Sequence, residues 1–284
     1  MNLSRIISGT MNWGTWGANY SKQEMCQLIS VSFDSGISSF DHADIYGGYT
    51  TEESFGDAFI DTGIKREDVF FISKCGIMYP SEKLPIKTKH YDYSEDHIIK
   101  SVNNSLEYLQ TDYLDCLLLH RPSPLMDINI IANTVEGLIK SGKIKSFGVS
   151  NFTADQMDMF KGKVEILYNQ INLSLTHLDH MFDGTLEYMQ ANNILPMAYS
   201  PLGSYFKEGN DKIKKVVESL KDKYSCTDYQ LLISWLLKHP SKVYPVIGTT
   251  KSDRIKKSMK SLKIEIELID WFELLEASVG KRVP

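Results

Sequence analysis

Four side chains that can move protons each stand just after a short apolar run in the sequence: Asp41, Tyr46, Lys74 and His120. A tyrosine, with a pKa of about 10, is a weak acid that suits protonation of an alkoxide. A nearby ammonium lowers this pKa because it favours the phenolate. An aspartate beside the lysine would keep the ammonium charged and in place, and a histidine could orient a carbonyl or relay the proton. If the fold brings these side chains together, they suit reduction of a carbonyl by hydride transfer.

The apolar runs before these residues belong to a series of eight predicted strands. The strands span residues 5–8, 38–40, 69–73, 114–119, 146–149, 166–168, 195–198 and 243–247. Between them lie predicted helices, several of which begin with the capping-box pattern, a hydroxyl residue followed three positions later by Glu or Gln. The pairs are Ser21 and Glu24, Thr50 and Glu53, Thr153 and Gln156, and Thr227 and Gln230. A long polar segment, residues 79–97, is predicted to be an insertion loop after the third strand.

This alternation of strands and helices predicts the fold class. Eight alternations within 284 residues, with no linker rich in Pro, Gly or Ser, predict an α/β protein that forms a single (β/α)8 TIM barrel domain over residues 1–284. A doubly wound open sheet is the alternative, but no predicted strand is followed by G-x-G-x-x-G or by a P-loop. In a barrel, functional residues lie at the C-terminal ends of the strands, which is where the four proton-transfer residues fall.

Further motifs follow the remaining predicted strands. They are Ser150-Asn151-Phe, Gln170, Tyr199-Ser-Pro-Leu-Gly203, Gly248-Thr and Arg254. Taken in order with Asp41-x-Ala-x-x-Tyr46-Gly, Lys74 and His120, this pattern resembles the aldo-keto reductase family, from about residue 5 to residue 254. Residues 42–49 and 73–76 are similar in particular to a bacterial branch of NADP-linked oxidoreductases.

The resemblance implies a (β/α)8 enzyme that binds NADPH in an extended pose without a Rossmann domain and reduces an aldehyde or ketone to an alcohol. It gives Tyr46 the role of general acid, Lys74 and Asp41 the role of tuning the Tyr46 pKa, and His120 the role of orienting the carbonyl. Ser150, Asn151 and Gln170 would contact the nicotinamide carboxamide, and Tyr199 would stack on the ring. The other implied cofactor contacts are Asp41, Gly9, Thr10, Met11, Ser200, Pro201, Leu202, Gly203, Gly248, Thr249, Thr250 and Arg254.

A basic segment supports binding of the cofactor phosphates. Residues 251–263 contain six Lys or Arg and one Asp, a local charge of +5 in a chain whose net charge is −5. The segment follows the eighth predicted strand, where barrels often bind phosphate at a helix N-terminus. A guanidinium such as that of Arg254 suits a 2′-phosphate, which favours NADPH, with NADH as the alternative. Lys257 and Ser258 stand where many family members have Glu-Asn.

The composition and the remaining aromatic residues indicate which ligands and partners to expect. Trp13, Trp16 and Tyr49 follow predicted strand ends and could line a substrate pocket or pack over the barrel mouth. The acidic net charge, with no aromatic residue inside the basic segment, argues against nucleic acid. No apolar run is long enough to cross a bilayer, and four widely spaced cysteines suit a reducing compartment. We expect a cytoplasmic monomer, without a metal cofactor, that acts on a small carbonyl compound.

Two other functions remain open at this point. A metal-dependent hydrolase on the same barrel could use His42, Asp44, His120 and the pair His177-x-x-His180. That interpretation leaves Lys74 and Tyr46 without a role. A non-enzymatic module could bind NADP(H) and report redox state to a partner, although all four catalytic positions are filled.

Overall fold

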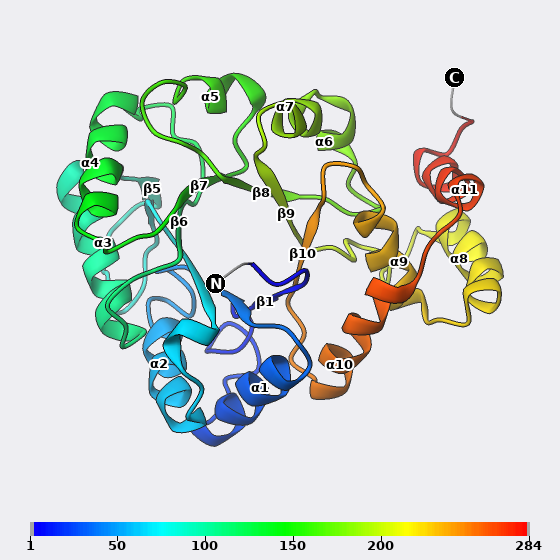
Figure 1. Ribbon diagram of the computed structural model, residues 1–284, viewed down its shortest axis with the longest axis horizontal. Helices are drawn as coiled ribbons and strands as arrows, with labels where there is room; N and C mark the ends of the chain where they lie inside the picture. The colour runs from blue at the N-terminus through cyan, green and yellow to red at the C-terminus, as the bar shows by residue number, and fades with distance from the viewer. Residues whose placement is uncertain (1–2, 283–284) are drawn as a thin grey trace.

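The computed structural model describes residues 3–282, which form a closed barrel of parallel strands surrounded by helices (Figure 1). The order around the barrel is β1-β10-β9-β8-β7-β6-β3-β2, and each neighbouring pair is parallel. The eight strands are β1 (Ile7–Gly9), β2 (Ser39–Asp41), β3 (Phe70–Cys75), β6 (Cys116–Leu119), β7 (Phe147–Ser150), β8 (Tyr168–Asn172), β9 (Leu195–Tyr199) and β10 (Tyr244–Ile247). The predicted (β/α)8 barrel is confirmed.

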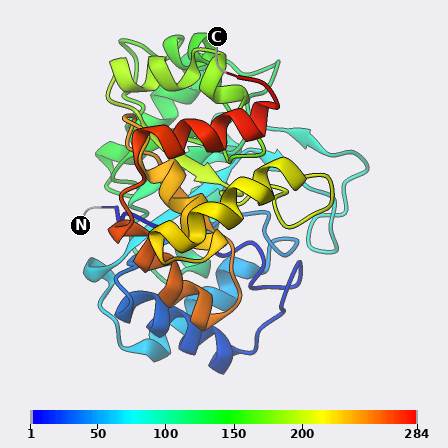
Figure 2. The ribbon, with the colours of Figure 1, turned by 90° about the vertical axis from the view of Figure 1, so that its right-hand side faces the viewer.

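Helices connect the strands and cover the outside of the barrel (Figures 1 and 2). They are α1 (Lys22–Asp34), α2 (Thr51–Thr62), α3 (Glu95–Tyr108), α4 (Ile128–Lys140), α5 (Ala154–Asp158), α6 (Asp179–Phe182), α7 (Thr185–Ala191), α8 (Asp211–Tyr224), α9 (Asp228–Leu237), α10 (Ser252–Lys260) and α11 (Leu268–Val279). Short 3-10 helices span Arg66–Asp68 and Ser261–Lys263. α11 packs against α8 at the outer edge of the molecule (Figure 2). Within residues 3–282, no helix combines the length and the apolar character needed to span a membrane.

Three of the four predicted capping boxes are formed. Ser21, Thr153 and Thr227 each accept the expected backbone N–H, and the Glu or Gln three residues later accepts from the capping residue. The prediction for Thr50 was wrong. Its hydroxyl donates to the carbonyl of Gly47 at 2.8 Å, because the turn after β2 brings that carbonyl closer than the helix amides. Glu53, the other member of the expected pair, forms an ion pair with Lys83 instead.

The boundary of one predicted strand and the content of one predicted loop need correction. β8 runs over Tyr168–Asn172, whereas the apolar pattern ended at residue 168, because the strand continues through polar residues that have partners. Gln170 donates to Asp41 inside the barrel, and Asn169 donates to the carbonyl of Phe152 outside it. The segment predicted as a loop, residues 79–97, contains β5 (His90–Tyr91), which pairs antiparallel with β4 (Ile77–Met78). Its last residues begin α3, which is capped by Ser94.

Alternation along β3 explains how a lysine comes to lie inside the barrel. Phe70 and Ile72 point inward and pack in a cluster that fills the barrel interior, while Phe71 and Cys75 point outward into the large core between sheet and helices. A strand reverses its side chains at each residue, so Lys74 points inward above Ile72. The apolar cluster therefore forms the floor on which the polar site rests.

Candidate active site

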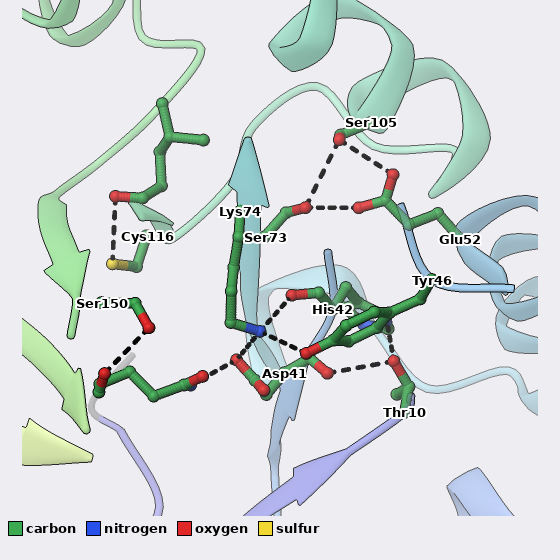
Figure 3. Close-up of polar contacts among 12 residues, drawn as sticks. Thr10, Asp41, His42, Tyr46, Glu52, Ser73, Lys74, Ser105, Cys116 and Ser150 are labelled. Carbon is green, nitrogen blue, oxygen red and sulfur yellow. Dashed lines mark hydrogen bonds and ion pairs between the residues drawn. The ribbon is translucent and has the colours of Figure 1, made fainter. Parts of the chain in front are cut away.

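The ammonium of Lys74 is the centre of the polar site (Figure 3). Its side chain is 0% exposed, and its Nζ lies 2.8 Å from Oδ1 of Asp41. Nζ also donates to the backbone carbonyl of His42 at 2.7 Å and to the hydroxyl of Tyr46 at 3.0 Å. An ammonium has three protons, so each of them has an acceptor. Burial alone would lower the pKa of Lys74, but Asp41 and Tyr46 outweigh it and raise the pKa, so the side chain stays charged.

Asp41 connects this lysine to the opposite wall of the barrel. It ends β2, where it lies beside Gly9 of β1 and Ile72 of β3. Its Oδ1 accepts a second hydrogen bond, at 2.8 Å, from Nε2 of Gln170 on β8. β8 is four strands away from β2 around the ring, so the amide reaches across the interior. The carboxylate is thereby fixed from two sides.

Tyr46 lies in the turn after β2, with its hydroxyl on the cavity side of Lys74. Because Lys74 donates to the phenol oxygen, the phenol's own proton is not used in that contact, and no acceptor for it is present among residues 3–282. Burial raises the pKa of Tyr46; Lys74 opposes this rise and Asp41 adds to it. Lys74 therefore lowers the pKa of Tyr46 as expected, but the loss of water around the phenolate outweighs the ammonium and the net shift is upward. Tyr46 is protonated at neutral pH.

His120 follows β6 and lines the same cavity as Tyr46. The two rings meet edge to face with centroids 6.0 Å apart. Burial, together with the charges of Lys74, Arg121 and Lys89, lowers the pKa of His120 well below its ordinary value. The imidazole is therefore neutral at neutral pH, and its buried Nδ1 has no hydrogen-bond partner among residues 3–282. It is suited to forming a hydrogen bond with a ligand rather than to acting as a strong acid.

These side chains open into a cavity of about 600 Å³ at the C-terminal ends of the strands. Residues from all parts of the ring contribute to it. Its lining comprises Gly9, Met11, Asn12, Trp16, Asp41, Ile45, Tyr46, Ile77, Tyr79, Lys89, His120, Arg121, Ser150, Gln170, Tyr199, Ser200, Val246 and Gly248. The cavity is thus the concave site that a barrel is expected to present at this end.

A second polar chain runs along the cavity wall formed by β7, β8 and β9. The hydroxyl of Tyr199 donates to Oδ1 of Asn151 at 2.9 Å, and Nδ2 of Asn151 donates to Oγ of Ser150 at 2.8 Å. Ser150 in turn donates to the backbone carbonyl of Gln170 at 2.9 Å. Asn151 has φ of +60°, a left-handed conformation that asparagine adopts more readily than most residues. An aromatic ring and neighbouring amide and hydroxyl groups therefore share one wall.

Not every residue predicted to contact a cofactor faces this cavity. Thr10 is fully buried behind β2, where its hydroxyl donates to the carbonyl of Asp41 and contacts Nδ1 of His42. Leu202 packs against the core. The other predicted contacts outside the cavity lining follow β7, β9 and β10; they are Asn151, Pro201, Gly203, Thr249, Thr250 and Arg254. Arg254 is exposed in the first turn of α10, the helix that follows β10 and Gly248.

The three aromatic residues proposed for a substrate pocket separate into different environments. The prediction for Trp13 was wrong: it is 0% exposed and packs against Phe40 and Phe55 in the core between sheet and helices. Tyr49 does not line the cavity either, since its hydroxyl is turned to the backbone of Ile77 and residue 79. Trp16 does line it, edge to face with Tyr79 at a centroid distance of 5.1 Å.

Sequence reasoning missed several residues of the cavity wall. Tyr79 and Lys89 belong to the segment that was predicted to be an insertion loop, and neither residue was singled out within it. Arg121 could have been found, because it stands directly beside His120 at the end of a predicted strand. Its position at a strand end is the feature of the sequence that indicates a place in the cavity wall.

The residues of the metal-hydrolase alternative do not converge. Within residues 3–282, no three His, Cys, Asp or Glu side chains are grouped as ligands for a metal ion. His42 points away from the cavity and packs edge to face against Phe55 at 4.3 Å. His177 and His180 pair with Asp179 and Asp183, and neither histidine lines the cavity.

Comparison with known proteins agrees with this fold. Residues 5–276 match the model of the aldo/keto reductase family. The chain is 39% identical to the uncharacterized oxidoreductase YcsN of Bacillus subtilis (strain 168), covering 100% of this chain and 97% of that one. It is 34% identical to a 6-dehydroglucose reductase of Agrobacterium fabrum, with coverage of 100% and 97%. Among solved structures, the thermostable aldo-keto reductase Tm1743, in complex with the inhibitor epalrestat, superposes with a TM-score of 0.83 at 27% identity, covering 96% of this chain and 94% of that one.

The structure is thus a (β/α)8 barrel whose C-terminal mouth holds buried Asp41, Lys74 and Tyr46 beside a neutral His120. The chain belongs to the aldo/keto reductase family. Its similarity to oxidoreductases over its whole length supports carbonyl reduction as the class of reaction.

Proposed function

We propose that this protein is an NADPH-dependent reductase of aldehydes or ketones in which Tyr46 is the general acid. The observation that carries the proposal is the direction of the hydrogen bond at Tyr46. Because Lys74 donates to the phenol oxygen at 3.0 Å, the phenol proton is left for a ligand in the cavity. An adjacent ammonium favours the phenolate, so it helps Tyr46 release that proton despite burial.

Different residues of this chain would bind the carbonyl oxygen, donate the proton and stabilise the resulting phenolate. When bound, the reduced nicotinamide supplies the hydride. Tyr46 and the neutral His120 would hold the carbonyl oxygen, and Tyr46 would donate its proton as negative charge develops there. Lys74 would stabilise the phenolate that remains, and Asp41 keeps Lys74 charged throughout. Gln170 fixes Asp41 and so acts as a positioning residue.

The cavity has features that suit the nicotinamide and its phosphates. At the floor of the cavity, position 9 has little room for a side chain, since a Cβ on Gly9 would lie 3.1 Å from Cγ1 of Val246. We assign the carboxamide to Ser150, Asn151 and Gln170, and ring stacking to Tyr199. We assign the 2′-phosphate to Arg254, which has no ion-pair partner within residues 3–282, whereas the nearby Lys257 is neutralised by Asp253 at 2.7 Å.

The cofactor assignment is tested by titrating tryptophan fluorescence with NADPH and NADH in parallel. Arg254→Ala should weaken NADPH binding by at least about tenfold, because a charge-assisted hydrogen bond is lost, and should leave NADH binding nearly unchanged. Lys257→Ala is the matched control on the same helix, and a much smaller effect is expected because Asp253 already pairs with it. Equal losses of both cofactors in Arg254→Ala would refute the assignment.

Turnover distinguishes the reductase from a module that only binds the cofactor. Purified protein should oxidise NADPH with aldehydes and form one alcohol per cofactor consumed. Binding of NADPH without turnover of any aldehyde would favour the redox-sensing module. No binding of either cofactor would contradict both.

We further propose that the protein acts in the cytoplasm as a monomer on a small carbonyl compound. All four cysteines are free thiols, and Cys75 and Cys116 are buried, which suits a reducing compartment. Size-exclusion chromatography with light scattering tests the monomer.

A further inference from the structure

Two cations at the cavity are not balanced by acidic side chains. Arg121 directly follows His120 after β6, and Lys89 directly precedes β5. Asp41 is the one acidic residue in the cavity lining, and Lys74 already neutralises it. Neither Arg121 nor Lys89 forms an ion pair with any residue in 3–282. The cavity is therefore positive beyond the requirements of the catalytic residues.

The guanidinium of Arg121 is held in a defined position with donors to spare. Its backbone N–H donates to the hydroxyl of the buried Tyr93 at 3.2 Å, and that hydroxyl donates to the Arg121 carbonyl, so the residue is tied at both backbone groups. Nη2 donates to the hydroxyl of Tyr199 at 3.4 Å, and the guanidinium lies 5.7 Å from the centre of the Tyr199 ring. A guanidinium has five N–H donors, so most remain available to a ligand.

The charges of Arg121 and Lys89 influence the pKa values of the neighbouring His120 and Tyr46. Arg121 and Lys89 both contribute to the lowered pKa of His120, and Arg121 also opposes the rise in the pKa of Tyr46. Arg121 is half-buried without a counter-charge, which is costly in free energy, and a bound anion would offset that cost. Lys89 is exposed and adds positive charge at the edge of the cavity. An oxyanion would also meet the planar donor geometry of Arg121.

The anion in question is not the cofactor phosphate. The basic segment that carries Arg254 follows β10, and β6 lies four strands from β10, on the opposite side of the ring. Lys89 shares the side of Arg121, because β5 pairs with β4, which follows β3, the neighbour of β6. Arg121 and Lys89 therefore lie on one side of the barrel mouth, and the basic segment with Arg254 lies on the opposite side.

We propose that the substrate is an anionic aldehyde or ketone whose carboxylate, phosphate or sulfonate group is bound by Arg121 and Lys89 while its carbonyl contacts Tyr46 and His120. This inference rests on the proposed reductase function. The shared chemistry is an oxyanion carried on the same molecule as the carbonyl.

The test compares substrates that differ in charge, beginning with a pair of closely matched shape. With NADPH, kcat/KM should be at least about tenfold higher for 4-formylbenzoate than for neutral 4-formylbenzamide, and the ratio should fall at high salt. Succinic semialdehyde against butanal, and glyceraldehyde 3-phosphate against glyceraldehyde, distinguish a carboxylate from a phosphate. Equal kcat/KM within every pair would overturn the inference and leave the reductase intact. No NADPH oxidation with any aldehyde would overturn the proposed function as well.

Variants of Arg121 and Lys89 test whether these two cations cause the preference for anionic substrates. Arg121→Met and Lys89→Gln should each reduce the anion-to-neutral ratio several-fold, and Arg121→Lys should retain part of it. Lys87→Gln is the matched control, since Lys87 is exposed in the same segment but does not line the cavity. If Arg121→Met lowers kcat/KM equally for both members of a pair, or weakens NADPH binding alone, Arg121 merely positions Tyr199 and the inference fails.

Discussion

Removing the negative partner of Lys74 should destabilise the fold strongly. The side chains of Lys74 and Asp41 are 0% and 4% exposed, with 2.8 Å between Nζ and Oδ1. In Asp41→Asn the ammonium keeps its hydrogen bonds to the His42 carbonyl and Tyr46 but loses its counter-charge. Breaking a buried ion pair from one side costs about 3–5 kcal/mol of unfolding free energy.

The double variant isolates the charge effect. In Asp41→Asn/Lys74→Met no buried charge is left unpaired, and replacing both partners of a buried pair is often nearly neutral. We therefore expect the double variant to be more stable than Asp41→Asn by at least about 2 kcal/mol. For 284 residues, an unfolding entropy of about 2.1 cal/mol/K per residue gives about 0.6 kcal/mol/K. The single variant should then lose about 5–8 °C in Tm.

The pH dependence of the unfolding free energy gives a second test, because its direction should differ between the wild type and Asp41→Asn. In the wild type the pKa of Lys74 is raised in the fold, so its stabilisation is present below the unfolded pKa of about 10.4 and is lost as pH rises through the folded value. In Asp41→Asn burial is no longer opposed by Asp41, the folded pKa falls below the unfolded one, and stability should rise with pH up to about 10.4. Urea unfolding at neutral and alkaline pH measures both effects. A single variant that is no less stable than the double variant would refute the reasoning.

Two further predictions concern the surroundings of the site. Burial raises the pKa of Asp44 to about 8, so the neutral carboxyl is favoured in the fold and stability should fall as pH rises from about 4 towards that value. Asp44→Asn should flatten this slope in urea unfolding, and an unchanged slope would contradict the assignment. Gly76→Ala should cost at least about 2 kcal/mol, because φ is +101° and a Cβ would lie 1.9 Å from Cε1 of Tyr93. Gly63→Ala, with φ of +69° and no atom within 4 Å of its Cβ, measures the backbone contribution alone; an equal loss in both variants would exclude overpacking.

The barrel could be predicted because its strands are short apolar runs between capped helices. Strands buried on both faces read as continuous apolar segments, and the capping boxes at Ser21, Thr153 and Thr227 marked where helices begin. Gln170 shows the limit of this method. A polar residue inside a strand looks like the strand's end, although it is in fact the cross-barrel partner of Asp41.

Side-chain direction and net electrostatics could not be predicted in the same way. Trp13 follows a strand end, yet its side chain turns into the core rather than the cavity. For Tyr46, the sequence indicates a nearby ammonium but not the loss of solvent, and burial is the larger influence on its pKa. Both quantities depend on packing that residue spacing does not specify.

The proton donor is the central claim, and it is tested most directly by comparing Tyr46→Phe with Tyr49→Phe. Tyr46→Phe should lower kcat for aldehyde reduction roughly 10²–10⁴-fold with NADPH affinity nearly unchanged. Tyr49→Phe should stay close to wild type, because its hydroxyl faces the backbone rather than the cavity. Full activity in Tyr46→Phe would contradict the proposed mechanism.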